Sequence, residues 1–378
     1  MAKELLINGA GGRIGRGVTY ETVKLLGEGS ANLELRALNE PMGLDALVKS
    51  LTSNDPVHGV YDWRVEKVQL SQGPGVRIVR GNVDLSLPFF AEKEPQKIPF
   101  EDLGVRMVLE CSGFFGDPKE LPGENGGKVF LNQGKVERVI ETYPSVKTAD
   151  SVMIMGVNHL SYNPDAHRII SNASCTTKSL AGPLQVLVDN DIEVGPLAMV
   201  TIHAETGKEL SKLARLVKER DAAIATEEIE QLFRMTTHST GAAKAAGYVI
   251  SSLEGKGKMS GMAYRVPTLD GSYANLYFVA KSHGAISVEG INDLMKKAVS
   301  NPKYAGRMCV FDGEDAQTKD IVGRRENAMV VVSKTNVQPI AGSFGERNAY
   351  LVTLVSGYDN ELGSAVDPVL LADFVAKS

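Results

Sequence analysis

The sequence has few cysteines, few aromatic residues and no excess of positive charge. Its 378 residues include three cysteines, Cys111, Cys175 and Cys309, which lie far apart and show no CxxC spacing. This excludes a disulfide framework and a cysteine-based zinc site, and it fits a reducing compartment. A net charge of −5 excludes an extended basic surface for nucleic acid or an anionic membrane. Any recognition of phosphate must therefore depend on a few placed residues.

Long apolar runs are also missing. No such run approaches the length that spans a bilayer, and the N-terminal Met-Ala-Lys-Glu leads into a predicted strand without the apolar core of a signal peptide. We therefore expect a soluble cytoplasmic protein with a small-molecule substrate, and no metal, nucleic-acid or membrane partner. The length, with 43% hydrophobic and 23% charged residues, is typical of a globular chain with two domains.

One stretch combines the end of a strand, a polar turn and a cysteine just before a predicted helix. The strand ends at Ser171, the turn is Asn172–Ser174, and the helix follows Cys175. Unpaired N–H groups and the dipole at a helix N-terminus favour negative charge, so we expect this thiol to ionise readily and to be nucleophilic. The polar flanking residues argue against a sealed apolar environment. From these residues alone, Cys175 is either a nucleophile or an inert buried cysteine.

A base for this thiol follows later in the chain. The strand-like Met199–Ile202 ends in His203, and an imidazole is suited to accept a thiol proton near neutral pH. The end of a strand directs a side chain into the cleft that a neighbouring strand-to-helix turn lines. The chain has five other histidines, so His203 is either this base or a hydrogen-bonded core residue.

The N-terminal segment has the pattern of a dinucleotide-binding β-α-β unit. A short strand precedes Gly9, Gly12 and Gly15, a helix follows, and a second strand, Leu33–Leu38, ends just before Glu40. The glycines let the backbone approach a pyrophosphate at a helix N-terminus, and an acid at the next strand end binds the adenosine ribose. Glu40 would repel a 2′-phosphate, so the pattern favours NAD over NADP. Alternatively, Glu40 is a solvated acid at the end of a strand and binds no ribose.

Further strand signals divide the chain into two parts. Short apolar runs suited to a covered parallel sheet occur at 77–79, 107–111 and 151–155. Longer strands, one of them alternating as in an antiparallel sheet, occur at 197–202, 275–281, 328–333 and 349–355. Helices are predicted after Ser287, after Asp367-Pro368 and, as two amphipathic surface helices, within 208–238. We expect an α/β Rossmann-type NAD-binding domain over 1–174, completed by a C-terminal helix at 361–378, and an α+β catalytic domain with a mostly antiparallel sheet over 175–360.

Five separated segments resemble those of phosphorylating glyceraldehyde-3-phosphate dehydrogenases. They occur in family order across nearly the whole chain, and they are Asn8–Arg16, Ser171–Thr177, Ser239–Ala245, Gly261–Thr268 and Tyr358–Glu361. The resemblance implies a cytoplasmic, glycolytic homotetramer that converts glyceraldehyde 3-phosphate, inorganic phosphate and NAD to 1,3-bisphosphoglycerate. It also implies that the cysteine forms a hemithioacetal and then a thioester, with the histidine as base and as hydrogen-bond donor to the oxyanion.

The resemblance also implies binding residues. Asn360 would hold the nicotinamide carboxamide, and the planar guanidinium of Arg265 would bind the substrate phosphate. The other positions that would contact the cofactor are Gly9, Gly12, Arg13, Ile14, Glu40, Lys93, Ser112, Gly113 and Thr142. The other positions that would bind substrate or inorganic phosphate are Ser174, Thr176, Thr206, Lys208, Thr240 and Gly241.

Several residues depart from the family pattern. The glycine loop has one extra residue, Glu40 stands where aspartate is usual, and Lys208 replaces a threonine near the substrate phosphate. Gly357 and Ser364 replace aromatic residues around the predicted nicotinamide site. The segment 208–238 is longer than its family counterpart and unrelated to it. In the family this segment supplies an arginine that binds inorganic phosphate. Here Arg215, Arg220 or Arg234 would take that role.

These departures leave two alternatives open. The first is a dehydrogenase of a related phosphorylated aldehyde such as erythrose 4-phosphate, with hydrolytic release of the thioester. The second is a non-catalytic NAD-binding paralogue, against which the presence of Cys175, His203, Arg265 and Asn360 argues. A Cys-His protease needs no β-α-β start, and an aspartate-semialdehyde dehydrogenase lacks the Tyr-Asp-Asn-Glu segment.

Overall fold

The chain forms two compact units. The computed structural model describes residues 3–116, 126–206, 233–250, 253, 259–341 and 347–378. The first unit comprises residues 1–55, 59–174 and 364–378, and the second comprises 56–58 and 175–363. None of the helices within these described ranges is both long and apolar enough to cross a membrane.

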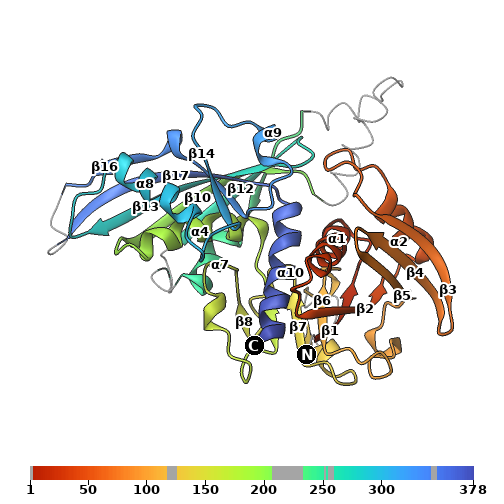
Figure 1. The fold of residues 1–378 in the computed structure, drawn as a ribbon. Coiled ribbons are helices and arrows are strands. Elements are labelled where there is room, and N and C mark those ends of the chain that lie inside the picture. Colours follow the sequence, from red (N-terminus) through yellow and green to blue (C-terminus); the bar gives the residue numbers. More distant parts are fainter. Residues whose placement is uncertain (1–2, 117–125, 207–232, 251–252, 254–258, 342–346) are drawn as a thin grey trace. The chain divides into compact units, whose positions relative to one another are not determined.

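The first unit is built on a nine-stranded sheet (Figure 1). Its strand order is β3-β4-β5-β2-β1-β6-β7-β9-β8, and every neighbouring pair from β5 to β8 is parallel. The strands are β1 (Lys3–Asn8), β2 (Leu33–Asn39), β3 (Arg64–Leu70), β4 (Gly73–Arg80), β5 (Val83–Phe90), β6 (Met107–Glu110), β7 (Arg138–Glu141), β8 (Ser151–Val152) and β9 (Ile169–Ser171). The helices are α1 (Arg13–Gly27), α2 (Leu44–Thr52), α3 (Lys128–Leu131) and α10 (Leu362–Lys377), with 3₁₀ turns η1 (Pro95–Lys97), η2 (Phe114–Gly116) and η3 (His159–Ser161). The predicted Rossmann-type fold is confirmed.

One predicted strand of the parallel sheet is wrong. The apolar run at 77–79 lies in β4, which pairs antiparallel with both β3 and β5. Only two residues separate β4 from each neighbour, and such short connections make hairpins, whereas parallel strands need a long crossover. The exposed face of the hairpin carries Arg77, whose Nη2 lies 2.6 Å from Asp84 Oδ2. A run of three residues is too short to distinguish the two arrangements.

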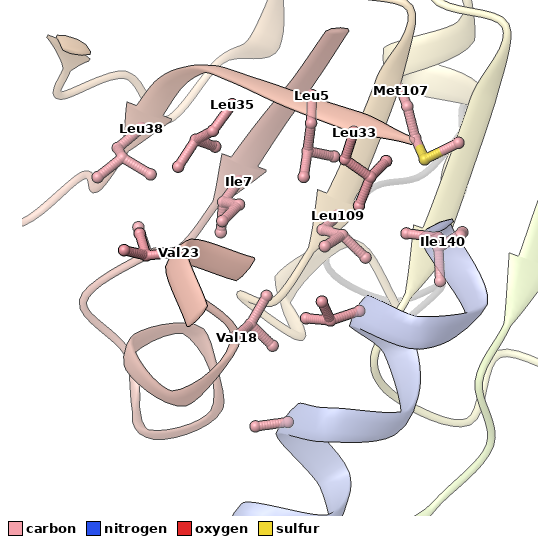
Figure 2. Packing of buried hydrophobic residues seen from close by; sticks show 14 of the residues in the cluster. Leu5, Ile7, Val18, Val23, Leu33, Leu35, Leu38, Met107, Leu109 and Ile140 are labelled. Carbon is pink, nitrogen blue, oxygen red and sulfur yellow. The ribbon is translucent and has the colours of Figure 1, made fainter. Parts of the chain in front are cut away.

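The core of the first unit lies between the parallel strands and two helices, α1 and α10 (Figure 2). Leu5 and Ile7 of β1, Leu109 of β6 and Val18 of α1 are fully buried in one cluster. The residues that α10 adds to this cluster are Ala365, Val369, Leu371, Ala372, Val375 and Ala376. Because α1 packs directly on this core, the start of α1 and the glycine loop before it are held in a fixed position.

Helix α10 runs from Leu362 to Lys377, which agrees with the C-terminal helix expected at 361–378. The helix cap expected at Asp367-Pro368 is wrong, because Pro368 lies inside the helix. The Asp359 carboxylate Oδ1 accepts hydrogen bonds from the backbone N–H groups of Glu361 at 2.9 Å and Leu362 at 2.7 Å. Asp359 therefore caps the helix. Asp367 instead accepts a hydrogen bond of 2.7 Å from Asn172 Nδ2.

The second unit is built on an eight-stranded, mostly antiparallel sheet, which confirms the predicted class. The order is β11-β12-β10-β13-β17-β15-β14, with β16 beside β17, and only the β10–β12 and β14–β15 pairs among these described strands are parallel. The strands are β10 (Glu193–Ala204), β11 (Thr236–Ser239), β12 (Met259–Val266), β13 (Ser272–Ser282), β14 (Met308–Phe311), β15 (Ala328–Val331), β16 (Asn336–Pro339) and β17 (Asn348–Tyr358). The helices are α4 (Cys175–Val188), α7 (Ala242–Val249), α8 (Val288–Val299) and α9 (Thr318–Ile321), with a 3₁₀ turn η6 (Val332–Lys334).

Helix α4 covers one face of this sheet, where it packs against β10, β13, β15 and β17. Side chains alternate along a strand, so the residues of β10 that are turned to this face are Leu197, Met199, Thr201 and His203. Arg265 is the register partner of His203 on β12, so its side chain shares that face. The sheet therefore carries a histidine and an arginine side by side beneath the helix.

Two further predictions concern helices of this unit. The capped start of α8 is confirmed, because Ser287 Oγ accepts the N–H of Gly290 at 3.1 Å. Most of the segment predicted to form two amphipathic helices, including Lys208, Arg215 and Arg220, lies outside the described residues.

Candidate active site

Cys175 is the first residue of α4 and follows a strained turn. Ala173 has a φ of 58°, a left-handed conformation that residues with a side chain rarely adopt. Two hydrogen bonds fix this turn, from the Ala173 N–H to Ser171 Oγ at 3.3 Å and from the Asn172 N–H to the Glu141 carbonyl at 2.8 Å. Strained backbone of this kind is retained where the surrounding contacts determine it and is frequent at functional sites. The predicted helix start beside Cys175 is confirmed.

The thiol of Cys175 meets the imidazole of His203. Sγ lies 3.4 Å from His203 Nε2, and His203 is 4% exposed. The other ring nitrogen, Nδ1, lies 2.8 Å from the Ala204 carbonyl and also contacts Arg265 Nη1. Arg265 Nη1 donates to the same carbonyl at 2.9 Å. Contacts on both ring nitrogens fix the orientation of the imidazole toward the sulfur.

Burial sets the ionisation of this pair. It lowers the pKa of His203 to about 4, and the charge of Arg265 acts in the same direction, so the imidazole is neutral at pH 7 and accepts a proton. Burial also raises the pKa of the Cys175 thiol, against the opposing effects of the Thr176 hydrogen bond and of the Lys178 and Arg265 charges. The predicted easy ionisation of this thiol is therefore wrong, because loss of water outweighs the favourable charges and the helix N-terminus.

A polar network behind the sulfur was not predicted from the sequence. The hydroxyl of the buried Tyr358 lies 2.8 Å from Thr176 Oγ1 and 2.9 Å from Thr201 Oγ1. The ring of Tyr358 meets His203 edge-on with centroids 5.9 Å apart. Lys178, one helical turn after Cys175, is 1% exposed. The charge of Lys178 lowers the pKa of the Cys175 thiol, although burial of the thiol raises it further.

The remaining predicted phosphate-binding residues lie on neighbouring segments. Thr206 is exposed just after β10, and Ser174 directly precedes Cys175. Thr240 and Gly241 lie at the N-terminus of α7, where Thr240 Oγ1 accepts the N–H of Ala242 at 3.2 Å. A helix N-terminus favours an anion. Lys208 lies outside the described residues.

The glycine loop of the first unit is tightly folded. Gly9 has a φ of 74°, and a Cβ atom at Gly15 would lie 1.9 Å from the Gly9 carbonyl oxygen. Gly12 is the exposed N-cap of α1 and has no side chain that occupies the first N–H groups of the helix. Glu40 Oε2 accepts the N–H of Gly11 at 2.9 Å, so the glycine loop is bonded to the predicted ribose-binding acid. This arrangement of a bare helix N-terminus beside a carboxylate fits a dinucleotide.

Glu110 at the end of β6 is a further residue that was not predicted. It is fully buried, accepts the Ser112 N–H at 2.7 Å and contacts Asn8 Nδ2. Burial raises its pKa to about 7. Because a Cβ atom at Gly9 would lie 2.8 Å from the Ser112 backbone nitrogen, these contacts link the glycine loop to the β6 end of the sheet.

The other predicted cofactor residues are distributed over both units. In the first unit, Arg13 and Ile14 open α1, the Thr142 N–H donates to the Glu110 carbonyl at 3.0 Å, and Ser112, Gly113 and Lys93 are exposed. Asn360 belongs to the second unit and is 6% exposed.

Comparison with known proteins agrees with this architecture. Residues 3–118 match the family described as glyceraldehyde 3-phosphate dehydrogenase, NAD binding domain, and residues 174–360 match that of the C-terminal domain of the same enzyme. The chain is 32% identical to the glyceraldehyde-3-phosphate dehydrogenase of Chlamydia muridarum over 98% of both chains. It is 32% identical to that of Chlamydia pneumoniae and 33% identical to that of Chlamydia trachomatis, over 99% of both chains in each case.

The fold and the family matches define an NAD-dependent oxidoreductase, whose cofactor is NAD. More particularly, the chain belongs to the glyceraldehyde-3-phosphate dehydrogenase family.

Proposed function

We propose that the chain oxidises glyceraldehyde 3-phosphate to 1,3-bisphosphoglycerate with NAD and inorganic phosphate. The observation that supports this most is the 3.4 Å approach of Cys175 Sγ to His203 Nε2, with Arg265 in contact with the same imidazole. A thiol with a neutral imidazole as its base can attack an aldehyde carbon. A guanidinium beside this pair suits an aldehyde that carries a phosphate.

Cys175 and His203 carry the bond changes at the aldehyde in this proposal. The thiol proton moves to His203 Nε2 while Sγ bonds to the carbonyl carbon, and the resulting N–H then donates to the oxygen of the hemithioacetal. Bound NAD supplies the acceptor for the hydride that leaves this carbon. Inorganic phosphate attacks the thioester that remains on Cys175, and the sulfur departs as a thiolate that His203 can protonate.

Phosphate groups are bound by neutral and cationic donors near this pair. Arg265 would bind the phosphate of the substrate, since its half-buried guanidinium has donors beyond the Nη1 that contacts Ala204. Thr240 and Gly241 at the start of α7 would bind the second phosphate through the helix N-terminus. Ser174, Thr176, Thr206 and Lys208 are the further proposed phosphate ligands.

The proposed cofactor residues of the first unit surround the glycine loop. Gly9, Gly12, Arg13 and Ile14 would contact the pyrophosphate, and Glu40 would accept hydrogen bonds from the ribose. Those that follow the neighbouring strands are Lys93, Ser112, Gly113 and Thr142. Asn360 of the second unit would bind the nicotinamide carboxamide.

We further propose that the enzyme is a homotetramer and that the open face of the second sheet joins two copies. Four neighbouring strands expose large apolar side chains on the face opposite α4: Ile202, Met262, Tyr277 and Leu351, each 39–41% exposed. Large apolar side chains exposed on neighbouring strands of one sheet face are typical of a protein interface. Leu351→Asp would then dissociate the tetramer in sedimentation velocity, whereas Met42→Asp, at a side chain 79% exposed in the first unit, would leave it intact. A monomeric wild-type chain would contradict this proposal.

We expect this enzyme in the cytoplasm. The structure contains no disulfide between Cys111, Cys175 and Cys309, which are all described and free. A nucleophilic thiol is maintained most readily in a reducing compartment.

A steady-state assay tests the proposed reaction. NADH formation from glyceraldehyde 3-phosphate should require phosphate or arsenate, and NADP should be a poor substitute for NAD. Parallel assays with erythrose 4-phosphate measure the preference between aldehydes. Equal rates with and without either anion would show that the thioester is released by water and would reject the phosphorylating reaction.

A further inference from the structure

Asn360 is held in place by residues that the proposed reaction does not use. Ser272 Oγ donates to Asn360 Oδ1 at 3.0 Å, and the Asn360 backbone N–H donates to Asp270 Oδ1 at 3.1 Å. Among the described residues, Asn360 Nδ2 has no hydrogen-bond partner. The side chain therefore offers its NH₂ group, which can donate to the carboxamide oxygen of a nicotinamide.

Asp270 is one of two buried carboxylates that face a single histidine. His58 Nε2 lies 2.8 Å from Asp359 Oδ2 and 3.2 Å from Asp270 Oδ2. The side chains of both aspartates are 0% exposed, and that of His58 is 10% exposed. Two buried carboxylates are no longer hydrated, so they need a hydrogen-bond donor or a positive charge between them. A third acid, Glu361, lies 3.9 Å from His58 Nδ1, so each ring nitrogen faces a carboxylate.

The two aspartates fix the backbone on both sides of Asn360. Asp359 precedes Asn360 and accepts the N–H groups of Glu361 and Leu362, which closes the first turn of α10. Its other oxygen, Oδ2, accepts the N–H of Gly323 at 2.8 Å. Asp270 accepts the N–H of Asn360 itself and that of Gly271 at 2.7 Å. His58 thus joins two carboxylates that together set the position of one asparagine.

We propose that His58 is a positioning residue for hydride transfer: it holds Asp270 and Asp359, which fix Asn360 and thereby select the face of the nicotinamide that is presented to the substrate. This inference rests on the proposed contact between Asn360 and the carboxamide of NAD. It assigns a role to a histidine that lies far from the nucleophile in sequence and takes no part in the Cys175–His203 contact. Loss of His58 should loosen Asn360 without changing the acid–base pair.

His58→Gln in the full-length enzyme is the first test, with His283→Gln, at an exposed histidine of the same unit, as the matched control. We expect KM for NAD and the dissociation constant of NAD to rise about 10-fold or more, because small displacements of a positioning group have effects of this size. KM for the aldehyde and the rate of Cys175 alkylation by iodoacetamide should change less than about twofold, since these depend on groups that His58 does not contact.

The stereochemistry of hydride transfer separates positioning from a general loss of stability. With substrate deuterated at the aldehyde carbon, the wild-type enzyme should deliver deuterium to one face of the nicotinamide, and His58→Gln should give a detectable fraction on the other. Asn360→Ala should show the same mixture. If His58 acts through Asn360, adding His58→Gln to Asn360→Ala should change NAD affinity less than about twofold.

Other outcomes would overturn the inference. These are an unchanged NAD affinity and single-face transfer in folded His58→Gln, or fully additive effects with Asn360→Ala. If His58→Gln does not fold, Asp270→Asn replaces it, because the amide keeps an acceptor for the Asn360 N–H and removes one charge opposite His58. NAD affinity is measured without the aldehyde, so the positioning role is still tested if glyceraldehyde 3-phosphate proves not to be the substrate.

Discussion

The glycine loop and the Cys175 site are assembled in different ways. The loop is part of one continuous β-α-β unit, in which Gly9, Gly15 and Glu40 follow each other closely in the chain. Cys175, His203 and Arg265 come from α4, β10 and β12, so their contacts depend on the register of the second sheet. A local pattern determines the first site, and tertiary packing determines the second.

This difference suggests that the two sites can be altered independently. A change in the loop should alter NAD affinity and leave the thiol reactive, and a change around the thiol should do the reverse. Two measurements distinguish these effects in every variant: the dissociation constant of NAD and the rate at which iodoacetamide alkylates Cys175.

Cys175→Ser should have the largest effect. Removing a nucleophile of a covalent mechanism lowers kcat about 10⁴-fold or more. NAD affinity should change less than about twofold, because the serine replaces only the sulfur. Cys309→Ser, at a second free cysteine of the same unit, is the control and should retain full activity. Substantial activity in Cys175→Ser would reject the thioester mechanism.

Gly15→Ala should damage the loop. The new Cβ would lie 1.9 Å from the Gly9 carbonyl oxygen, so the loop or the start of α1 must move. Overpacking of this kind costs about 1–3 kcal/mol of stability, and NAD affinity should fall about 10-fold or more as the backbone N–H groups shift. Calorimetry and NAD titration measure both effects.

Gly182→Ala is the matched control, since it lies in α4 and a Cβ there would meet no atom within 4 Å. Replacing a glycine in a helix by alanine should add about 0.5–1 kcal/mol of stability. Normal NAD affinity in Gly15→Ala would show that the close approach of α1 to the loop is not needed for the cofactor.

The contrast between the two sites also explains what could be predicted from the sequence. The β1–α1–β2 unit was predictable because its glycines, its hydrophobic periodicity and the terminal acid are adjacent in the chain. Cys175 and His203 were singled out by residue type and family resemblance, yet their 3.4 Å contact follows from α4 lying across β10. The raised pKa of the thiol was not predictable, because desolvation depends on residues brought together from several strands.

Other features were missed for related reasons. The cap of α10 is Asp359, whereas the sequence pattern favours the later Asp367-Pro368 pair, because aspartate followed by proline is typical of a helix start. The cluster of His58 with Asp270 and Asp359 joins three segments that no local pattern connects. Glu141 ends an apolar strand, and only the structure shows that its carboxyl is fully buried.

Glu141→Gln should change the pH dependence of stability. Burial raises the pKa of Glu141 from 4.5 to about 7, so the folded state binds a proton more tightly than the unfolded state. Wild-type stability should therefore fall as pH rises from about 4.5 to 7, and the glutamine variant should lack this contribution, which amounts to at most about 3 kcal/mol. Thermal unfolding at pH 5 and pH 8 measures the difference.

The exposed Glu101→Gln, also in the first unit, is the control for Glu141→Gln and should show the wild-type pH dependence. The partners of the Glu141 carboxylate recorded in the structure are the Gly127 N–H at 2.7 Å and the Ser145 hydroxyl, both neutral. By contrast, His58 faces Asp359. Burial alone would raise the pKa of Asp359, but the hydrogen bond and charge of His58 help to lower it below its usual value. An equal pH dependence in Glu141→Gln and wild type would show that Glu141 does not ionise in this range.

Lys178→Met should have the smallest effect and the most specific one. The buried Lys178 charge lowers the pKa of the Cys175 thiol, although burial of the thiol raises it further. The thiolate is the form that iodoacetamide attacks, so alkylation accelerates as pH rises through the thiol pKa. Without the charge, this profile should move to higher pH.

Methionine has nearly the length of lysine and suits a buried position, so the Lys178→Met variant should remain folded. Lys244→Met, at an exposed lysine of α7, is the matched control and should keep the wild-type alkylation profile. NAD affinity should be unchanged in both variants, because neither lysine is one of the proposed cofactor residues. A Lys178→Met profile that coincides with wild type would show that the Lys178 charge does not affect the pKa of the thiol. The helix N-terminus, Thr176 and Arg265 would then be the groups that lower this pKa against the effect of burial.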